Sequence, residues 1–221
     1  MNNEAITEIY NILLEAFGPQ HWWPGDSPFE IAVGAILTQN TNWTNVEKAI
    51  ANLKKADALS PQRLHTLSQD NIAVLIKSAG YFNIKAKRLK NFINWLFDNY
   101  NGSLDDLENV STSTLREQLL AVKGIGPETA DSILLYALKR PTFVVDAYTA
   151  RIMARHQLAL IPVVYEELKY LFESNLEENV DIFNEYHALL VQLGKNFCRP
   201  RPLCQSCPLN HLPHTLESME G

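Results

Sequence analysis

The chain has 221 residues, 46% of them hydrophobic, which is enough for one large domain or two small ones with a sizeable core. Its 25 acidic and 19 basic residues give a net charge of −6, which excludes nucleic-acid binding through overall charge and leaves it to local basic clusters. No run of about 18 apolar residues occurs, so no membrane span is expected. Residues 1–17 lack the basic start and the cleavage site of a signal peptide, so a cytoplasmic protein is expected.

Almost every segment repeats its apolar residues at helical spacing. Helices are predicted at 6–17, 29–37, 44–53, 68–78, 84–100, 147–156, 163–174 and 180–193, with further helix starts at 60–61 and 111–114. Only 142–145 has β-like content, and it is too short to make a sheet. The sequence therefore predicts an all-α fold of about ten helices in two lobes.

Residues 119–152 are the most informative stretch. A helix leads into the turn Gly124-Ile125-Gly126, a second helix follows, and the apolar run 143–145 then delivers a lone Asp146. Glycine lets backbone amides approach an anion closely and adopts the positive φ that such a turn needs. The next helix adds the partial positive charge of its N-terminus. The pattern predicts a phosphate grip at the turn, and an aspartate that is either catalytic or a plain helix N-cap.

This order of elements resembles the helix-hairpin-helix DNA glycosylase superfamily, the group that includes endonuclease III. Residues 35–41 are similar to the family's early helix and glutamine-bearing turn, residues 80–86 to its strand-wedging loop, and the cysteine-rich tail to its iron–sulfur loop. The resemblance implies two helical lobes with a substrate cleft between them. It assigns residues 25–141 to one lobe, with the helix-hairpin-helix at about 115–138, and residues 1–24 plus 142–221 to the other.

The resemblance also implies a monomeric protein whose partner is double-stranded DNA containing damaged bases. In the family an amide side chain fills the gap left by a flipped nucleotide, and an aromatic loop wedges the opposite strand. Here the same residues could equally be capped helix ends or core aromatics. The residues that would contact DNA are Gln39, Asn40, Tyr81, Phe82, Asn83, Lys85, Lys123, Gly124, Ile125, Gly126 and Thr129. Lys85 opens the basic cluster 85–90, the cluster most expected to meet phosphates.

Asp146 is the candidate catalytic residue. Cleavage of an N-glycosidic bond builds positive charge on the sugar, and a carboxylate against C1′ stabilises that charge and orients or activates water. Bifunctional members of the family place a lysine two residues after the second glycine of the turn, as the amine that forms a Schiff base. This chain has Glu128 there, and a carboxylate cannot form an imine. The resemblance therefore implies a base-excision-repair glycosylase that is monofunctional and hydrolyses the bond with water.

Aromatic residues indicate the kind of base. Trp22, Trp23 and Pro24 lie in a proline-rich loop, and Trp43 follows the glutamine turn. They either cap the core or form a stacking pocket for an extruded base, with Lys195 near that pocket or on a phosphate. Indoles favour a cationic base through cation–π attraction, and N3- or N7-alkylated purines carry that charge. These features resemble the 3-methyladenine glycosylases of the endonuclease III-like branch.

The alternative substrates are oxidised pyrimidines or mismatched bases. The alternatives of another class are a non-catalytic helix-hairpin-helix DNA-binding module and a metal-stapled scaffold for protein partners. A lone aspartate behind two valines argues against the module, because gripping a phosphate needs no carboxylate there.

Three cysteines crowd into the tail with the spacing Cys-x5-Cys-x2-Cys. They are Cys198, Cys204 and Cys207. The family's cluster loop has four, as Cys-x6-Cys-x2-Cys-x5-Cys, and the fourth place here holds Pro213. Either His211 or His214 could complete a Cys3His set for a [4Fe–4S] cluster or for zinc, or the loop holds no metal. A cluster or a zinc ion in this loop would be structural, and the cleavage of the glycosidic bond needs no cofactor.

Overall fold

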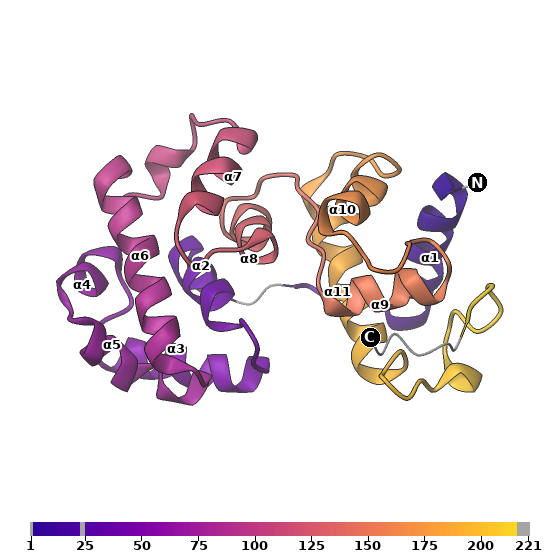
Figure 1. The fold of residues 1–221 in the computed structure, drawn as a ribbon, viewed down its shortest axis with the longest axis horizontal. Helices are drawn as coiled ribbons and strands as arrows, with labels where there is room; N and C mark the ends of the chain where they lie inside the picture. The colour runs from indigo at the N-terminus through magenta and orange to yellow at the C-terminus, as the bar shows by residue number, and fades with distance from the viewer. Residues whose placement is uncertain (1, 23–24, 216–221) are drawn as a thin grey trace. The chain divides into compact units, whose positions relative to one another are not determined.

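The computed structural model describes residues 2–22 and 25–215, with the side chains of all of these except residues 2 and 3. Every regular element in that part of the chain is helical, so the all-α prediction is confirmed. The chain divides into two compact units, Met1–Trp22 with Pro141–Gly221 and Trp23–Arg140 (Figure 1). None of the described helices combines the length and the apolar character that a membrane span requires.

The unit Trp23–Arg140 is built around α2 (Pro28–Leu37). Eight of the ten residues of α2 are buried, as expected for a helix that is apolar on all sides. It packs against α3 (Trp43–Lys55), α6 (Phe82–Tyr100), α8 (Pro127–Ser132) and the π-helical segment η3 (Ile133–Ala137). The remaining elements of the unit are α4 (Pro61–Thr66), α5 (Gln69–Leu75), η1 (Lys77–Ala79), η2 (Asp105–Leu107) and α7 (Thr112–Ala121).

Side-chain caps fix where several helices begin. The hydroxyl of Ser60 accepts from the backbone N–H of Arg63, and that of Ser111 from the N–H of Thr114, at the two helix starts that the sequence predicted. Each such cap stabilises a helix by about 1 kcal/mol. The same arrangement recurs at Ser27, Asn42, Ser68 and Asn179.

The start of α6 differs from the prediction. The sequence predicts a loop through 80–86 with the helix from 84, but the helix begins at Phe82. Tyr81 adopts a left-handed conformation with φ of 45°, and its carbonyl accepts the N–H of Lys85 as the first helical bond. Phe82 and Asn83 therefore lie in the first turn of a helix rather than in a loop, and Tyr81 is the exposed aromatic at the bend.

The second unit, Met1–Trp22 with Pro141–Gly221, is organised by α11 (Val180–Asn196). This helix packs on α9 (Ala147–Arg155) and on α1 (Asn2–Phe17). Gly194 permits the close approach to α9, because a Cβ atom there would collide with the ring of Tyr148. Phe143 stacks on Phe172 of α10 (Tyr165–Glu173), with ring centroids 3.9 Å apart. The tail carries the short helix η4 (Cys204–Ser206).

Lys85 is not available to a phosphate, which corrects the prediction of a DNA contact there. Its side chain is 1% exposed, and its Nζ donates to the carbonyls of Leu37, at 2.8 Å, and Ala79, at 2.7 Å. Lys90 of the same cluster donates to three carbonyls at the C-terminal end of α4. Both ammonium groups thus satisfy the carbonyls at helix ends, which have no partner within their own helix.

We expect Lys85→Met to lower the free energy of unfolding by about 1–3 kcal/mol, because two carbonyls lose their donor. Burial, together with the charge of Arg88, lowers the pKa of Lys85 to about 8 from 10.5. Between these two values the unfolded chain binds more protons than the folded one, so the contribution of Lys85 to stability rises with pH. The difference in unfolding free energy between the native protein and Lys85→Met should therefore be larger at about pH 9.5 than at about pH 7. Urea titrations at the two pH values measure this difference, and Lys87→Met, which removes an exposed lysine of the same helix, is the matched control.

Candidate functional site

Asp146 is the N-cap of α9, at the end of the buried run Phe143-Val144-Val145. One carboxylate oxygen, Oδ1, accepts two bonds from Thr149: the backbone N–H at 2.7 Å and the hydroxyl at 2.9 Å. The other oxygen, Oδ2, takes no part in the cap, and the side chain keeps 12% of its surface exposed. The two readings of the sequence, cap and reactive carboxylate, are therefore compatible in one side chain.

His187 stands beside this carboxylate and was missed by the sequence reasoning. It comes from α11, is buried, and places Nε2 3.7 Å from Oδ2 of Asp146. Burial lowers the pKa of His187, Asp146 raises it, and Lys195 lowers it. A histidine on an apolar helix face carries no sequence signal of its own, since only the packing of α11 on α9 brings it to the aspartate.

Lys195 and Trp22, two of the predicted base-pocket residues, lie together. The Nζ of Lys195 is 5.4 Å from the centroid of the Trp22 ring, over its face. Lys195 follows Gly194, so the close packing of α11 on α9 sets where the lysine emerges. Both residues belong to the same unit as Asp146. Trp23 and Pro24, the other two residues of that loop, lie outside the described part of the chain.

The glycine turn belongs to the other unit, between α7 and α8. Gly124 has φ of +100°, and a Cβ atom there would overlap the side chain of Arg88, so both backbone and space require glycine. Gly126 has φ of −99°, which any residue can adopt, and a Cβ atom there would meet nothing within 4 Å. The positive φ that the turn needs is therefore supplied by the first glycine.

Gln39 is bonded to this turn. Its Nε2 donates to the carbonyl of Gly124, at 3.1 Å, and to the hydroxyl of Thr129, at 2.9 Å, while Oε1 accepts from Arg88. Thr129 and Ile125 are buried, so their side chains support the turn from inside, and the predicted contact with DNA would be made by the backbone of the turn. Asn40, with φ of 53°, and Lys123 are exposed.

A buried ion pair joins the two helices of the hairpin. Arg116 of α7 donates through Nε and Nη2 to both oxygens of Asp131 in α8, at 2.8 and 3.0 Å, and the Asp131 side chain is fully buried. A bidentate pair fixes both distance and orientation. Glu128, at the place of the family's lysine, is an exposed residue in the first turn of α8.

Trp43 lies in the same unit as the turn, at the start of α3. Its ring is half-buried, and Nε1 donates to the Glu47 carboxylate at 2.9 Å. It lines a pocket of about 260 Å³ with three carboxylates and one ammonium group, those of Asp26, Glu30, Glu47 and Lys54. Lys54 pairs with Asp26 at 2.7 Å and with Glu30 at 2.9 Å, so an ammonium group already meets two of the three carboxylates.

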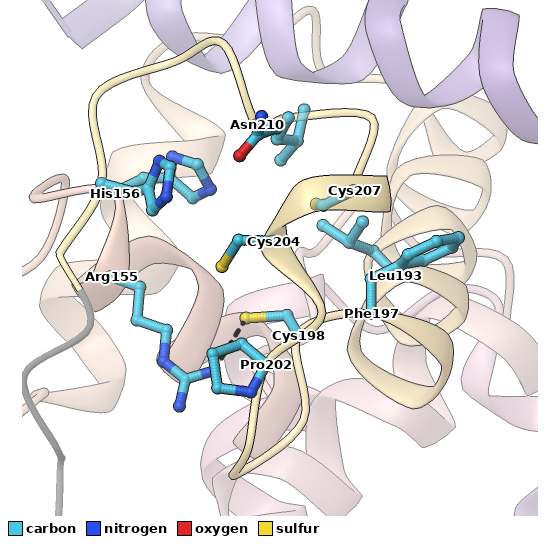
Figure 2. A pocket seen from close by; sticks show the side chains of 11 residues that line it. Arg155, His156, Leu193, Phe197, Cys198, Pro202, Cys204, Cys207 and Asn210 are labelled. Atoms are coloured by element: carbon cyan, nitrogen blue, oxygen red, sulfur yellow. Dashed lines mark hydrogen bonds between the residues drawn. The ribbon is translucent and has the colours of Figure 1, made fainter.

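The three cysteines line one small cavity of about 20 Å³ in the tail (Figure 2). Arg155 of α9 crosses to this loop and donates to the Cys198 sulfur at 3.3 Å and to the carbonyls of Arg199 and Pro200 at 2.6 and 3.0 Å. His214 and His156 also line the cavity, whereas His211 does not. His156 was not predicted, because it lies far from the cysteines in sequence.

The donor set does not fit a cluster held by four thiolates. Pro213 stands at the position of the family's fourth cysteine. The guanidinium of Arg155 donates a hydrogen bond to the sulfur of Cys198. In the described part of the chain, no three histidine, cysteine or acidic side chains are placed to hold a metal ion as they stand. The tail is instead tied to α9 by its arginines, since Arg151 also donates to the Cys198 carbonyl at 2.7 Å.

Comparisons with known proteins agree with this geometry. The family model described as HhH-GPD superfamily base excision DNA repair protein matches residues 33–177. A Methanocaldococcus jannaschii protein named as a candidate DNA repair glycosylase is 48% identical, over 93% of this chain and 94% of its own. The endonuclease III of Haemophilus influenzae is 32% identical, over 88% of this chain and 87% of its own. The crystal structure of the H. pylori 3-methyladenine DNA glycosylase bound to 1,N6-ethenoadenine aligns with a TM-score of 0.74 and 27% identity, over 88% of this chain and 97% of that one.

We expect Gln39→Leu to weaken binding to a duplex with an abasic site by about 5- to 10-fold, because two bonds that hold the turn are lost. Fluorescence anisotropy at one fixed salt concentration measures the dissociation constant. Thr129→Val removes the hydroxyl that accepts one of these bonds, so it should also weaken binding. Thr129→Ser keeps the hydroxyl and should bind like the native protein. If Gln39→Leu weakens binding and Thr129→Val does not, the Gln39 amide contacts DNA directly.

Proposed function

Because the chain belongs to the HhH-GPD superfamily of base excision DNA repair proteins, we propose that it is a monofunctional DNA glycosylase for alkylated purines of the 3-methyladenine kind. The family match and the relatives establish the coarser part: a DNA glycosylase of base excision repair that binds DNA. The resemblance to this superfamily and its endonuclease III-like branch is thereby confirmed. The choice of base and the absence of a lyase step are the proposal.

The carboxylate of Asp146 carries the proposal. Oδ1 is committed to Thr149, and Oδ2, which takes no part in the cap, is the oxygen that can face the sugar. As the glycosidic bond breaks, the sugar gains positive charge, and a preorganised anion stabilises it without reorganising at that moment. The same oxygen accepts a hydrogen bond from the attacking water and takes its proton as the new bond to C1′ forms. The electron pair of the broken bond leaves with the base.

Glu128 supports hydrolysis rather than covalent catalysis. An amine nucleophile is needed for a Schiff base with the sugar, and this position supplies an exposed carboxylate. Lys123 precedes the glycine turn in sequence, and Lys85 of α6 is buried and donates to two carbonyls. Neither stands at the place of the family's lysine.

Two indoles support an alkylated purine. Trp43 donates to the Glu47 carboxylate, and the Trp22 ring holds the ammonium of Lys195 over its face, which is the contact that an indole makes with a cation. N3- and N7-alkylated purines are cationic and leave readily, so they need little help from an acid. The H. pylori structure, named as a 3-methyladenine DNA glycosylase, is similar to this chain at 27% identity.

A neutral alkylated purine is the second candidate. The ammonium of Lys195 over Trp22 repels a cationic base that approaches the same ring face, and a neutral base such as 1,N6-ethenoadenine meets no such repulsion. That base is the ligand in the H. pylori structure. The two candidates differ in the charge of the base: a cationic purine leaves as a neutral base, whereas a neutral purine must take up a proton as it leaves.

Base release from DNA that contains 3-methyladenine, 7-methylguanine or 1,N6-ethenoadenine is the decisive assay. We expect release of at least one of these bases, and a fall of at least about 100-fold in Asp146→Asn, because the charge is lost. Asparagine caps a helix as well as aspartate does, so folding and affinity for an abasic duplex should be retained. Release from an oxidised-pyrimidine duplex in place of these three would overturn the substrate proposal, and an active Asp146→Asn protein would overturn the mechanism.

Borohydride reduction tests the absence of a lyase step. A Schiff base between enzyme and sugar is trapped by reduction as a stable covalent adduct, which denaturing gel electrophoresis detects. We expect no adduct with the native protein at enzyme concentrations that release the base completely, with a bifunctional endonuclease III as the positive control. An adduct with the native protein contradicts monofunctional hydrolysis.

Cys204→Ser combined with Cys207→Ser should leave the rate of base release within about twofold. Asp146 and Arg155 stand at opposite ends of α9, nine residues or about 13 Å apart, so the cavity lies a full helix away from the carboxylate. The rate constant is measured in single-turnover assays, with iron and zinc content determined in the same preparations. Activity that falls in proportion to lost metal would show that the chemistry depends on this loop.

A further inference from the structure

The second oxygen of Asp146 faces a single imidazole. The Nε2 of His187 is 3.7 Å from Oδ2, and both side chains are nearly enclosed, at 6% and 12% exposure. The first oxygen is already fixed by Thr149. The bonds to Oδ1 limit rotation of the carboxylate, and a contact at Oδ2 would limit it further from the opposite side.

The packing of α11 fixes the backbone that carries the imidazole. The neighbouring Tyr186 donates its hydroxyl to the carbonyl of Ile6 in α1 at 2.8 Å. Further along α11, the absence of a side chain at Gly194 lets the helix close on Tyr148 of α9. The two contacts hold α11 against α1 on one side and against α9 on the other, so His187 is delivered to Asp146 by rigid elements.

The charge state of His187 decides what it can do for the carboxylate. Burial is the largest influence and lowers its pKa, Lys195 on the same helix acts in the same direction, and Asp146 on α9 opposes them. A neutral imidazole can donate one N–H without cancelling the negative charge. A protonated one would form an ion pair and weaken the attraction between the carboxylate and the developing positive charge on the sugar.

We propose that His187 is a positioning residue for Asp146: its neutral imidazole directs an N–H at Oδ2 and sets the plane of the carboxylate toward the sugar. The inference rests on the catalytic role proposed for Asp146. The 3.7 Å separation exceeds a hydrogen bond in the DNA-free protein, and such catalytic contacts commonly shorten when the substrate is bound. The role is thus one of orientation, exerted through Asp146 and not on the base or the sugar.

Three variants at one position test the inference. His187→Gln keeps an N–H donor at about the place of Nε2, His187→Asn has a donor one methylene too short to reach, and His187→Leu has none. The expected result is a single-turnover rate constant near the native value for His187→Gln and lower by about 10- to 100-fold for the other two. The dissociation constant for an abasic duplex should stay within about twofold throughout.

Tyr186→Phe is the matched control, because it removes a structural hydrogen bond one residue away on the same helix. It should lower the melting temperature and leave the rate constant within about twofold, because the close contact of Gly194 with Tyr148 still holds α11 against α9, the helix that carries Asp146. Equal rates for His187→Gln and His187→Asn would overturn the proposal, and that comparison holds even where His187→Leu fails to fold. Native rates in all His187 variants with an inactive Asp146→Asn would refute the role of His187 alone. An active Asp146→Asn would refute the proposed function beneath it.

Discussion

The two hydrogen bonds from Thr149 to one oxygen of Asp146 are the constraint on which the reactive end of the molecule depends. They start α9, and they fix where the carboxylate lies. The run before it is held in place by packing, with Phe143 stacked on Phe172, so the cap cannot drift along the chain. A helix N-cap holds an anion without additional residues, because the backbone N–H groups of the first turn are the hydrogen-bond donors. Stability and chemistry then use different oxygens of one side chain.

In the unit Trp23–Arg140, hydrogen bonds from side chains likewise fix the glycine turn between α7 and α8. Side chains of the types that usually bind DNA form the scaffold of the glycine turn here: Gln39 bonds to Gly124 and Thr129, and Arg88 packs where a Cβ would otherwise stand. The Arg116–Asp131 pair then locks the two helices together. What remains for DNA is the backbone of the turn and its exposed neighbours, which suits contact with a phosphate, since the phosphate is the same at every sequence.

Local patterns predicted what local interactions determine. The caps at Ser60, Ser111 and Asp146 and the need for glycine at 124 could be read from the sequence, because each depends on residues within one turn. The burial of Lys85, the bonds of Gln39 and the approach of His187 to Asp146 could not, because each joins segments that only the packed fold brings together. A lysine near a basic cluster is indistinguishable in sequence from one that caps helix ends inside the core. The family resemblance supplied the function, and it did so through the order of elements, which no single residue carries.

Helix α9 relates the chemistry to the tail. The catalytic candidate begins it, and Arg151 and Arg155, one turn apart near its other end, donate to the backbone and sulfur of the cysteine loop. Two arginines that bond to carbonyls organise a loop as a metal would, by converging several donors on it, but they do not require the loop to supply anionic ligands. A loop held by these arginine hydrogen bonds can lack one cysteine ligand and still pack on α9. The incomplete cysteine set is therefore consistent with a catalytic end that retains the carboxylate, its cap and the imidazole beside it.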